Sequence, residues 1–186
     1  MTTTDTRALI LDAFAAQLAA AGYPGVSLVA VAREAGIRKP SVYHHFPGGK
    51  EEVFTAVALR FIDDLARRVQ GAVAVDGGLA ERLTGLATTA AEHGPRDVSF
   101  EQRVWDALDQ VAESTRTLVM QRYAEGVLGP VVSLFEQAVE AGEVHGDPGM
   151  LMNAFLHLAR AAGPDDAAAM ADLFLDGARA QRPSRG

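Results

Sequence analysis

The stretch IRKPSVYHHFPGGKEE, residues 37–52, decides the fold of this chain. A proline follows two cations, a tyrosine and two histidines come next, and two glycines lead into a lysine. On a helical wheel, one arc carries Val42, Tyr43 and Phe46, and the opposite arc carries Arg38, Ser41, His44 and His45. The spacing therefore predicts a short helix over residues 39–45, with an apolar side that packs and a polar side that faces outward.

A helix this short is unstable alone, so the helix before it must hold it in place. That helix is expected to begin at Ser27, a good N-cap residue, and to end at Gly36, which suits a left-handed C-cap. Pro40 fits the first turn of the short helix, where no backbone N–H is needed. Two helices joined by a tight glycine turn form the helix-turn-helix motif, whose second helix enters the major groove of DNA.

The polar residues of this stretch have the chemistry that DNA binding uses. Arg38 or Lys39 can donate to guanine edges, and the histidines can donate to bases or phosphates. Lys50 begins the next helix, and a helix amino terminus attracts phosphate through its free N–H groups and its dipole. We therefore predict a DNA-binding set that consists of Ser27, Arg38, Lys39, Pro40, Ser41, Tyr43, His44, His45 and Lys50.

The charge distribution agrees with this prediction but does not decide it. The net charge is −7, yet residues 1–50 hold five cations and three acids, giving +2, and residues 51–186 hold 12 and 21, giving −9. A basic segment on an acidic body can bind phosphate locally, although an unevenly charged solvated surface has the same counts. Cysteine is absent, which excludes disulfides and thiolate metal sites. Without a signal-peptide pattern or a membrane-spanning apolar run, we expect a cytoplasmic protein.

Helical periodicity dominates the rest of the chain and predicts an all-α fold. The first helix is expected to stop near Gly22, and the fourth to begin after Gly48-Gly49 and to stop before Gly77-Gly78. Further helices are expected over residues 79–92, 98–112, 115–128, 131–142, 149–161 and 166–180, divided by glycine and proline pairs. Pro130 is expected to break or bend the helical run, or to lie in a loop.

Residues 27–57, SLVAVAREAGIRKPSVYHHFPGGKEEVFTAV, resemble the TetR family of transcriptional regulators. The matching features are the initial serine, Ala35-Gly36, Tyr43, His45-Phe46 and Lys50-Glu51. Two residues differ from the family pattern, because Arg38 stands where Ser or Thr is common and Pro40 where Gly is common. We therefore expect an operator sequence that is individual to this protein.

The resemblance implies an all-α fold of about nine helices. It implies a helix-turn-helix head over residues 1–48, a helical effector-binding and dimerisation body over 49–182, and a disordered tail over 183–186. It further implies a homodimer that binds a pseudo-palindromic DNA operator, by family default as a repressor, and is released by a small-molecule effector. Effector binding in the body would tilt the fourth helix and change the spacing of the two heads.

An effector pocket is expected around Trp105, the only tryptophan. By analogy with the family, its predicted lining is Phe61, Phe100, Arg103, Trp105, Met120 and Tyr123. A plain core without a ligand is the alternative. The last two helices carry apolar stripes, and family analogy predicts a dimer interface of Leu151, Phe155, Leu158, Met170, Leu173 and Phe174. The alternative is that these stripes pack inside one subunit.

Catalytic and cofactor motifs do not fit the sequence. The GGKEE segment lacks the earlier glycine and the Ser or Thr of a phosphate-binding loop, so it does not predict a nucleotide-binding site. His44 and His45 are adjacent on a helix and do not converge on one metal ion, and either can be an ordinary surface histidine. We predict no enzyme activity, cofactor or metal. The competing hypothesis is a helical carrier or enzyme whose head docks a protein partner.

Overall fold

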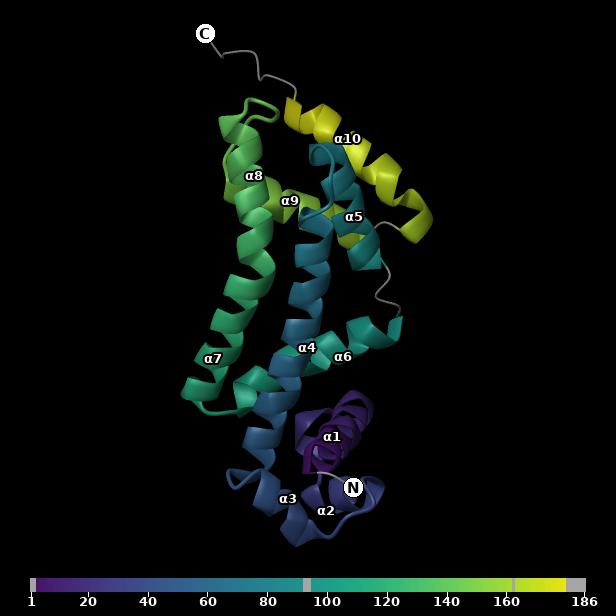
Figure 1. The fold of residues 1–186 in the computed structure, drawn as a ribbon, viewed down its shortest axis with the longest axis vertical. Coiled ribbons are helices and arrows are strands. Elements are labelled where there is room, and N and C mark those ends of the chain that lie inside the picture. Colours follow the sequence, from purple (N-terminus) through teal and green to yellow (C-terminus); the bar gives the residue numbers. More distant parts are fainter. Residues whose placement is uncertain (1–2, 92–94, 162, 180–186) are drawn as a thin grey trace. The chain divides into compact units, whose positions relative to one another are not determined.

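The computed structural model describes residues 3–91, 95–161 and 163–179, and these residues form helices and turns without any strand (Figure 1). The predicted all-α class is confirmed. The α-helices are α1 (Thr3–Gly25), α2 (Leu28–Glu34), α3 (Lys39–His45), α4 (Gly49–Val73), α5 (Leu79–Ala91), α6 (Pro95–Ala107), α7 (Glu113–Tyr123), α8 (Gly129–Glu140), α9 (Pro148–Ala161) and α10 (Ala167–Arg179). The expected tail, residues 183–186, lies outside the described residues.

The chain divides into two compact units. The first unit contains residues 1–63 and 95–122, and the second contains residues 64–94 and 123–186. The first unit therefore combines the predicted head with the first half of α4 and with α6 and α7. The predicted boundary after residue 48, between a DNA-binding head and an effector-binding body, concerns function and stays a prediction.

The first unit is built on α1, which packs against α2 and α6, while α3 packs against α2 (Figure 1). The apolar face of α1 is fully buried at Ile10, Phe14 and Leu18. α1 is kinked at Gly22, where the sequence predicted its end, because Gly22 leaves the helical conformation, and helix continues beyond the kink to Gly25. The side chain of Gln17 joins α1 to both ends of α2, since it accepts from the Ser27 N–H at 3.3 Å and donates to Glu34 at 3.2 Å.

The second unit has a core of aromatic rings. In it, α5 packs against α9 and α10, and α8 packs against α9. The rings of Phe135, Phe155 and Phe174 contact one another, with centroids 5.4–6.0 Å apart. Each pair is tilted or edge-to-face, as aromatic pairs prefer.

Four residues of the predicted dimer interface belong to the core of the second unit. Leu151, Phe155, Met170 and Phe174 are buried within the single chain, whereas Leu158 and Leu173 are 41% and 69% exposed. A side chain that its own unit already covers adds little surface to an interface. The interface prediction therefore narrows to the outward faces of α9 and α10 that carry the two exposed leucines.

The helical run does not break at Pro130. A five-residue π turn, Ala124–Leu128, follows α7, and Pro130 lies in the first turn of α8. The Gly129 N–H donates to the carbonyl of Ala124, five residues back. Proline offers no N–H and crowds the preceding turn, and a widened turn accommodates both effects. The expected break or loop is thus a π turn inside continuous helix.

Within the described residues, no helix combines the length and the apolar character needed to cross a bilayer.

Candidate nucleic-acid interface

The turn between α2 and α3 has the geometry that its sequence predicts. Gly36 has a φ of +68°, a left-handed conformation that glycine adopts without steric cost. The Gly36 N–H donates to Arg33 and the Ile37 N–H donates to Ala32, at 3.2 and 2.9 Å. These two bonds form a Schellman motif, which satisfies the last carbonyls of α2 and turns the chain sharply.

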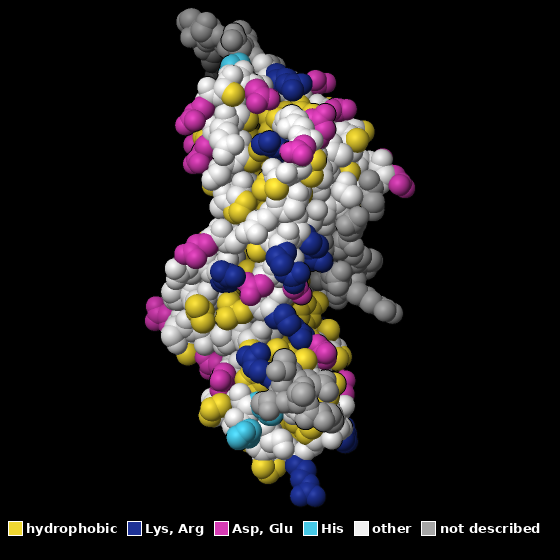
Figure 2. Space-filling model, viewed as in Figure 1, with side chains coloured by type: hydrophobic (Ala, Val, Ile, Leu, Met, Phe, Trp, Pro, Cys, Tyr) yellow, Lys and Arg dark blue, Asp and Glu magenta, His cyan; other side chains and the backbone are white. Residues whose placement is uncertain are grey.

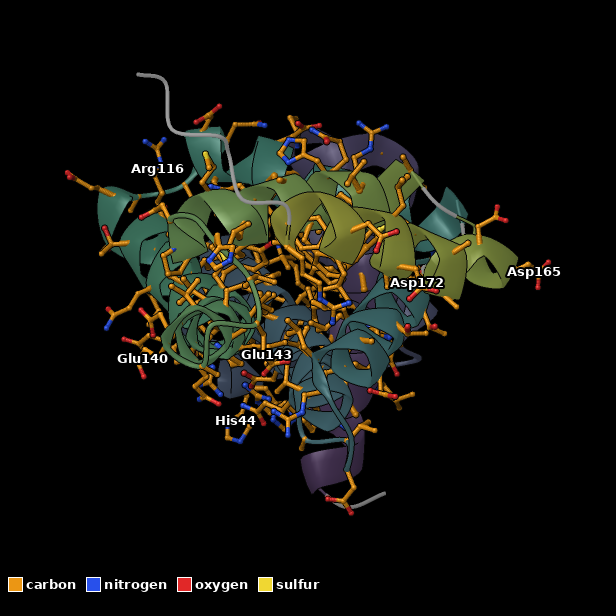
Figure 3. The ribbon with its side chains drawn as sticks, turned by 90° about the horizontal axis from the view of Figure 1, so that it is seen from above. His44, Arg116, Glu140, Glu143, Asp165 and Asp172 are labelled. Atoms are coloured by element: carbon orange, nitrogen blue, oxygen red, sulfur yellow. The ribbon has the colours of Figure 1, made fainter. Side chains whose placement is uncertain are left out.

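The candidate recognition helix α3 is anchored by two buried side chains, and its other side chains are exposed or half-buried. Val42 and Phe46 are fully buried. The side chains of Arg38, Lys39, Pro40 and His44 are exposed, whereas Ser41 and His45 are half-buried. Figure 3 shows His44 pointing away from the helices. Pro40 lies in the first turn, as predicted. The apolar and polar sides of the predicted helix are therefore both present.

Tyr43 does not share the burial of Val42 and Phe46, although the wheel placed it on their arc. It is 44% exposed, because it lies at the edge of the packed face. One edge of its ring faces Gly49, where an added β-carbon would stand 3.5 Å away. The Lys39 amine lies 5.8 Å from the ring centroid. Tyr43 thus links α3 to the start of α4 and still presents surface to solvent.

A tight turn sets the direction of α4. The Gly49 N–H donates to the Phe46 carbonyl at 2.9 Å, with Pro47 as the second residue of the turn. Gly49 has a φ of +69°, which explains why a glycine stands there. Glu52 accepts from the Gly48 N–H at 2.7 Å, in the manner of a capping box.

Lys50 and Ser27 occupy helix starts near the recognition helix in sequence. Ser27 is the N-cap residue of α2, but its hydroxyl makes no capping hydrogen bond and the residue is exposed. The Lys50 amine lies 4.5 Å from the centroid of the Tyr23 ring. Burial lowers the pKa of the Lys50 amine, and burial together with the charge of Glu51 raises the pKa of the Tyr23 hydroxyl.

Glu51 connects the first turn of α4 to the start of α7. Its Oε1 accepts from the Ala112 N–H at 2.9 Å and from the Thr115 hydroxyl at 2.7 Å. An acidic group at a helix amino terminus also interacts favourably with the helix dipole. Farther along the same two helices, Arg122 pairs with Asp63 at 2.6 Å. The helix that follows the recognition helix is therefore fastened to α7 at two places.

Aromatic rings accompany three of the five cations in residues 1–50. The Arg7 guanidinium lies 4.9 Å from the Phe46 centroid, in addition to the pairs Lys39–Tyr43 and Lys50–Tyr23. Among the described residues, none of these five cations forms an ion pair with a carboxylate. Figure 2 shows blue and cyan side chains at the end of the view where Figure 1 places α2 and α3. The arrangement leaves positive charge available to an anionic partner.

The predicted effector residues lie on α4, α6 and α7. Phe61 and Phe100 form an edge-to-face pair with centroids 5.4 Å apart. Arg103 lies beside Gly22, and Trp105 donates to Glu101 at 3.1 Å. Met120 is 48% exposed on α7, and Tyr123 belongs to the second unit. The Phe61–Phe100 contact joins α4 to α6, and the pocket itself stays a prediction.

Sequence reasoning missed Tyr23, Glu51 and Arg7 as parts of this region. Tyr23 lies just after the kink of α1 at Gly22, and only folding brings it to Lys50. Glu51 and its two partners are 61 and 64 residues apart. Local patterns carry no information about such distant pairs, although an acid in the first turn of α4 was a visible helix-start signal.

Comparison with known proteins agrees with this geometry. Residues 10–57 match the family model described as bacterial regulatory proteins, tetR family. This range contains α2, α3 and the start of α4. No curated protein matches the chain in sequence.

Several solved structures share the fold. A TetR family protein from Vibrio parahaemolyticus is 26% identical, with a TM-score of 0.74, covering 91% of this chain and 96% of that one. AibR, solved with isovaleryl coenzyme A and operator DNA, is 21% identical, with a TM-score of 0.71 and coverages of 90% and 97%. The superantigen PfiT is 16% identical, with a TM-score of 0.79 and coverages of 96% and 98%. The amino-terminal part of this chain, residues 10–57, therefore matches the tetR family of bacterial regulatory proteins, and the chain shares the all-α fold of the solved TetR family protein.

Proposed function

We propose that this protein is a transcriptional regulator that binds a pseudo-palindromic DNA operator as a homodimer through α3. The observation that carries the proposal is the division of α3 into two sides. Val42 and Phe46 anchor the helix from behind, and an exposed polar side remains. Arg38, Lys39 and His44 stand on that side, with donors that suit base edges and phosphates.

The neighbouring helix starts supply the positioning contacts of the proposal. Lys50 carries a full charge at the start of α4, and Ser27 has a hydroxyl that its own helix does not use. Contacts from such groups to phosphates orient the recognition helix without reading sequence. Tyr43, exposed and next to Gly49, offers its hydroxyl to a phosphate as well.

A small-molecule effector is proposed to release the DNA. In AibR, which shares the fold, the solved complex contains both isovaleryl coenzyme A and operator DNA. In this chain Phe61 on α4 contacts Phe100 on α6. An effector that displaced this ring pair would move α4, whose first turn carries Lys50. DNA and effector would then weaken each other's binding by the same factor.

The homodimer is proposed to use the exposed face of α9 and α10. Leu158 and Leu173 are the exposed large apolar side chains there, together with Met150 at the start of α9. Replacing Leu173 by Glu should turn a dimer into a monomer in sedimentation velocity, while circular dichroism stays helical. A monomeric wild-type protein would contradict this part of the proposal.

The direct test is DNA binding measured by fluorescence anisotropy on the DNA upstream of the protein's own gene, at several salt concentrations. Sequence-specific, salt-sensitive binding is expected. Lys50→Ala and Tyr43→Phe should weaken binding to all sequences, whereas Arg38→Ala and Lys39→Ala should also alter which bases are preferred. Arg179→Ala, an exposed cation on α10, is the matched control and should change nothing.

The competing function is a helical carrier or enzyme whose head docks a protein. A shared fold does not fix function, since the superantigen PfiT has the same architecture. The regulator proposal fails if the protein binds no DNA sequence more tightly than random DNA. It also fails if all the variants lose the same affinity on every sequence.

A further inference from the structure

The contact between Lys50 and Tyr23 has no role in the prediction from sequence. The Lys50 amine stands 4.5 Å from the Tyr23 ring centroid, which is within the range of a cation–π interaction. The same ring packs edge-to-face on Phe54, with centroids 5.2 Å apart. Lys50 and Phe54 are four residues apart and therefore lie on the same face of α4. One tyrosine ring thus contacts both a polar and an apolar side chain of the first two turns of α4.

The ring is itself fixed in place. Phe54 is fully buried, so the edge of Tyr23 that contacts it is anchored to the core. Tyr23 follows Gly22, where α1 leaves its helical path, and precedes the start of α2. A lysine on a long flexible stem loses many rotamers when it binds a phosphate. A fixed ring beneath the amine removes part of that freedom before the ligand arrives, which favours binding.

A ring also differs from a carboxylate in what it does to charge. The tyrosine ring is neutral, so the Lys50 amine keeps its net charge for a phosphate. The two glutamates that follow Lys50 have other hydrogen-bond partners. Glu51 accepts from Ala112 and Thr115, and Glu52 accepts from Gly48. Neither glutamate forms an ion pair with Lys50 among the described contacts.

We infer that Tyr23 is a positioning residue for Lys50, holding its amine by the ring face in the orientation that contacts a DNA phosphate. This inference rests on the proposed function, in which Lys50 binds the DNA backbone. Tyr23 itself touches no base or phosphate in this scheme, and it acts only through the lysine.

The first experiment tests the contact without DNA. Lys39 and Lys50 are the only lysines of the chain, so protein labelled with 13C at the lysine ε-carbon gives two NMR signals. Lys39→Arg and Lys50→Arg assign them. The ring current of Tyr23 should move the Lys50 signal upfield, Tyr23→Leu should abolish that shift, and Tyr23→Phe should keep it. A Lys50 signal that is the same with and without the ring overturns the inference.

The second experiment tests the consequence for DNA. Tyr23→Leu should weaken operator binding about three- to tenfold, from loss of a modest cation–π contact in each subunit. Tyr23→Phe should restore the affinity, because the ring remains. In a Lys50→Ala background, Tyr23→Leu should add nothing. The salt slope should fall with Lys50→Ala but not with Tyr23→Leu, since the latter keeps the charge.

The outcomes separate the two proposals. If Lys50→Ala leaves the affinity unchanged, the DNA role of Lys50 fails. If Tyr23→Leu weakens binding equally with and without Lys50, Tyr23 is merely structural and the positioning role fails. Circular dichroism melting checks the fold of each variant, and Tyr23→Met replaces Tyr23→Leu if the latter unfolds.

Discussion

The cations of residues 1–50 and the arginines of the later helices have different partners. Arg7, Lys39 and Lys50 lie over aromatic rings. Later in the chain, arginines pair with carboxylates in Arg60–Asp12, Arg67–Asp64, Arg116–Asp109 and Arg122–Asp63. A carboxylate cancels the charge that it holds, whereas a ring orients a cation and leaves its charge intact. The first arrangement suits a surface that binds an anion, and the second suits cations that stabilise the protein's own helices.

The largest effect is expected when a ring of the amino-terminal region is removed. Phe46 is fully buried and supports Arg7, so Phe46→Ala should lower the free energy of unfolding by about 3–5 kcal/mol. Chemical denaturation measures the change. Phe155→Ala in the second unit should cost a similar amount and serves as the control. DNA binding should be lost at a lower denaturant concentration in Phe46→Ala than in Phe155→Ala, and equal loss would contradict the comparison.

The next largest effect is expected when an uncharged ring beside a cation is replaced by a charged side chain. Tyr43→Glu would place a carboxylate near Lys39, whose amine now lies 5.8 Å from the tyrosine ring. It should weaken operator binding by about 100-fold, because it both cancels a cation and repels phosphate. Tyr43→Gln has the same shape without the charge and should be several times milder. If the two variants bind DNA equally well, the charge of the partner does not matter.

A smaller effect is expected where α4 is fastened to α7. Glu51→Ala leaves the Ala112 N–H and the Thr115 hydroxyl without their acceptor, and should cost about 1–2 kcal/mol of stability. Glu51→Gln keeps an acceptor oxygen and should cost less. Thermal melting of both variants, and of each combined with Thr115→Val, measures the coupling. Additive changes in the double variants would show that Glu51 does not act through Thr115.

The smallest effect is expected at an ion pair of the later helices. Arg122 and Asp63 are both about half exposed, so Arg122→Gln should change stability by at most about 1 kcal/mol, and less at high salt. DNA affinity should stay within about twofold, because this charge is already cancelled by Asp63. If Arg122→Gln lowers DNA affinity as much as Lys50→Ala does, cations paired with carboxylates and cations lying over rings do not differ in their role in DNA binding.

The helix-turn-helix was predictable because its signals are local. Gly36, Pro40 and the pair Val42 and Phe46 each depend on neighbours within a few residues, and the structure places them as predicted. Tyr43 was assigned to the buried side because a wheel does not show where a packed face ends. The edge of that face is set by the helix behind it.

The later half of the chain was harder to interpret from sequence. The stripes of α9 and α10 were correctly apolar, but a stripe does not reveal its partner. Phe155 and Phe174 meet Phe135 of α8 inside the same unit. Glu51 and Tyr23 gave no signal for their contacts, since these contacts form between segments that are far apart in sequence.

The first unit is interrupted in the sequence, and this has a consequence for synthesis on the ribosome. Its last residue is 122, and a stretch of the second unit, residues 64–94, is translated before α6 and α7 emerge. Until then α1 has no α6 to cover it, and Glu51 has no partner on α7. A nascent chain that ends near residue 57 would contain the whole recognition helix but would still lack α6 and α7. Expression of the amino-terminal region alone is therefore expected to need residues 95–122 supplied with it.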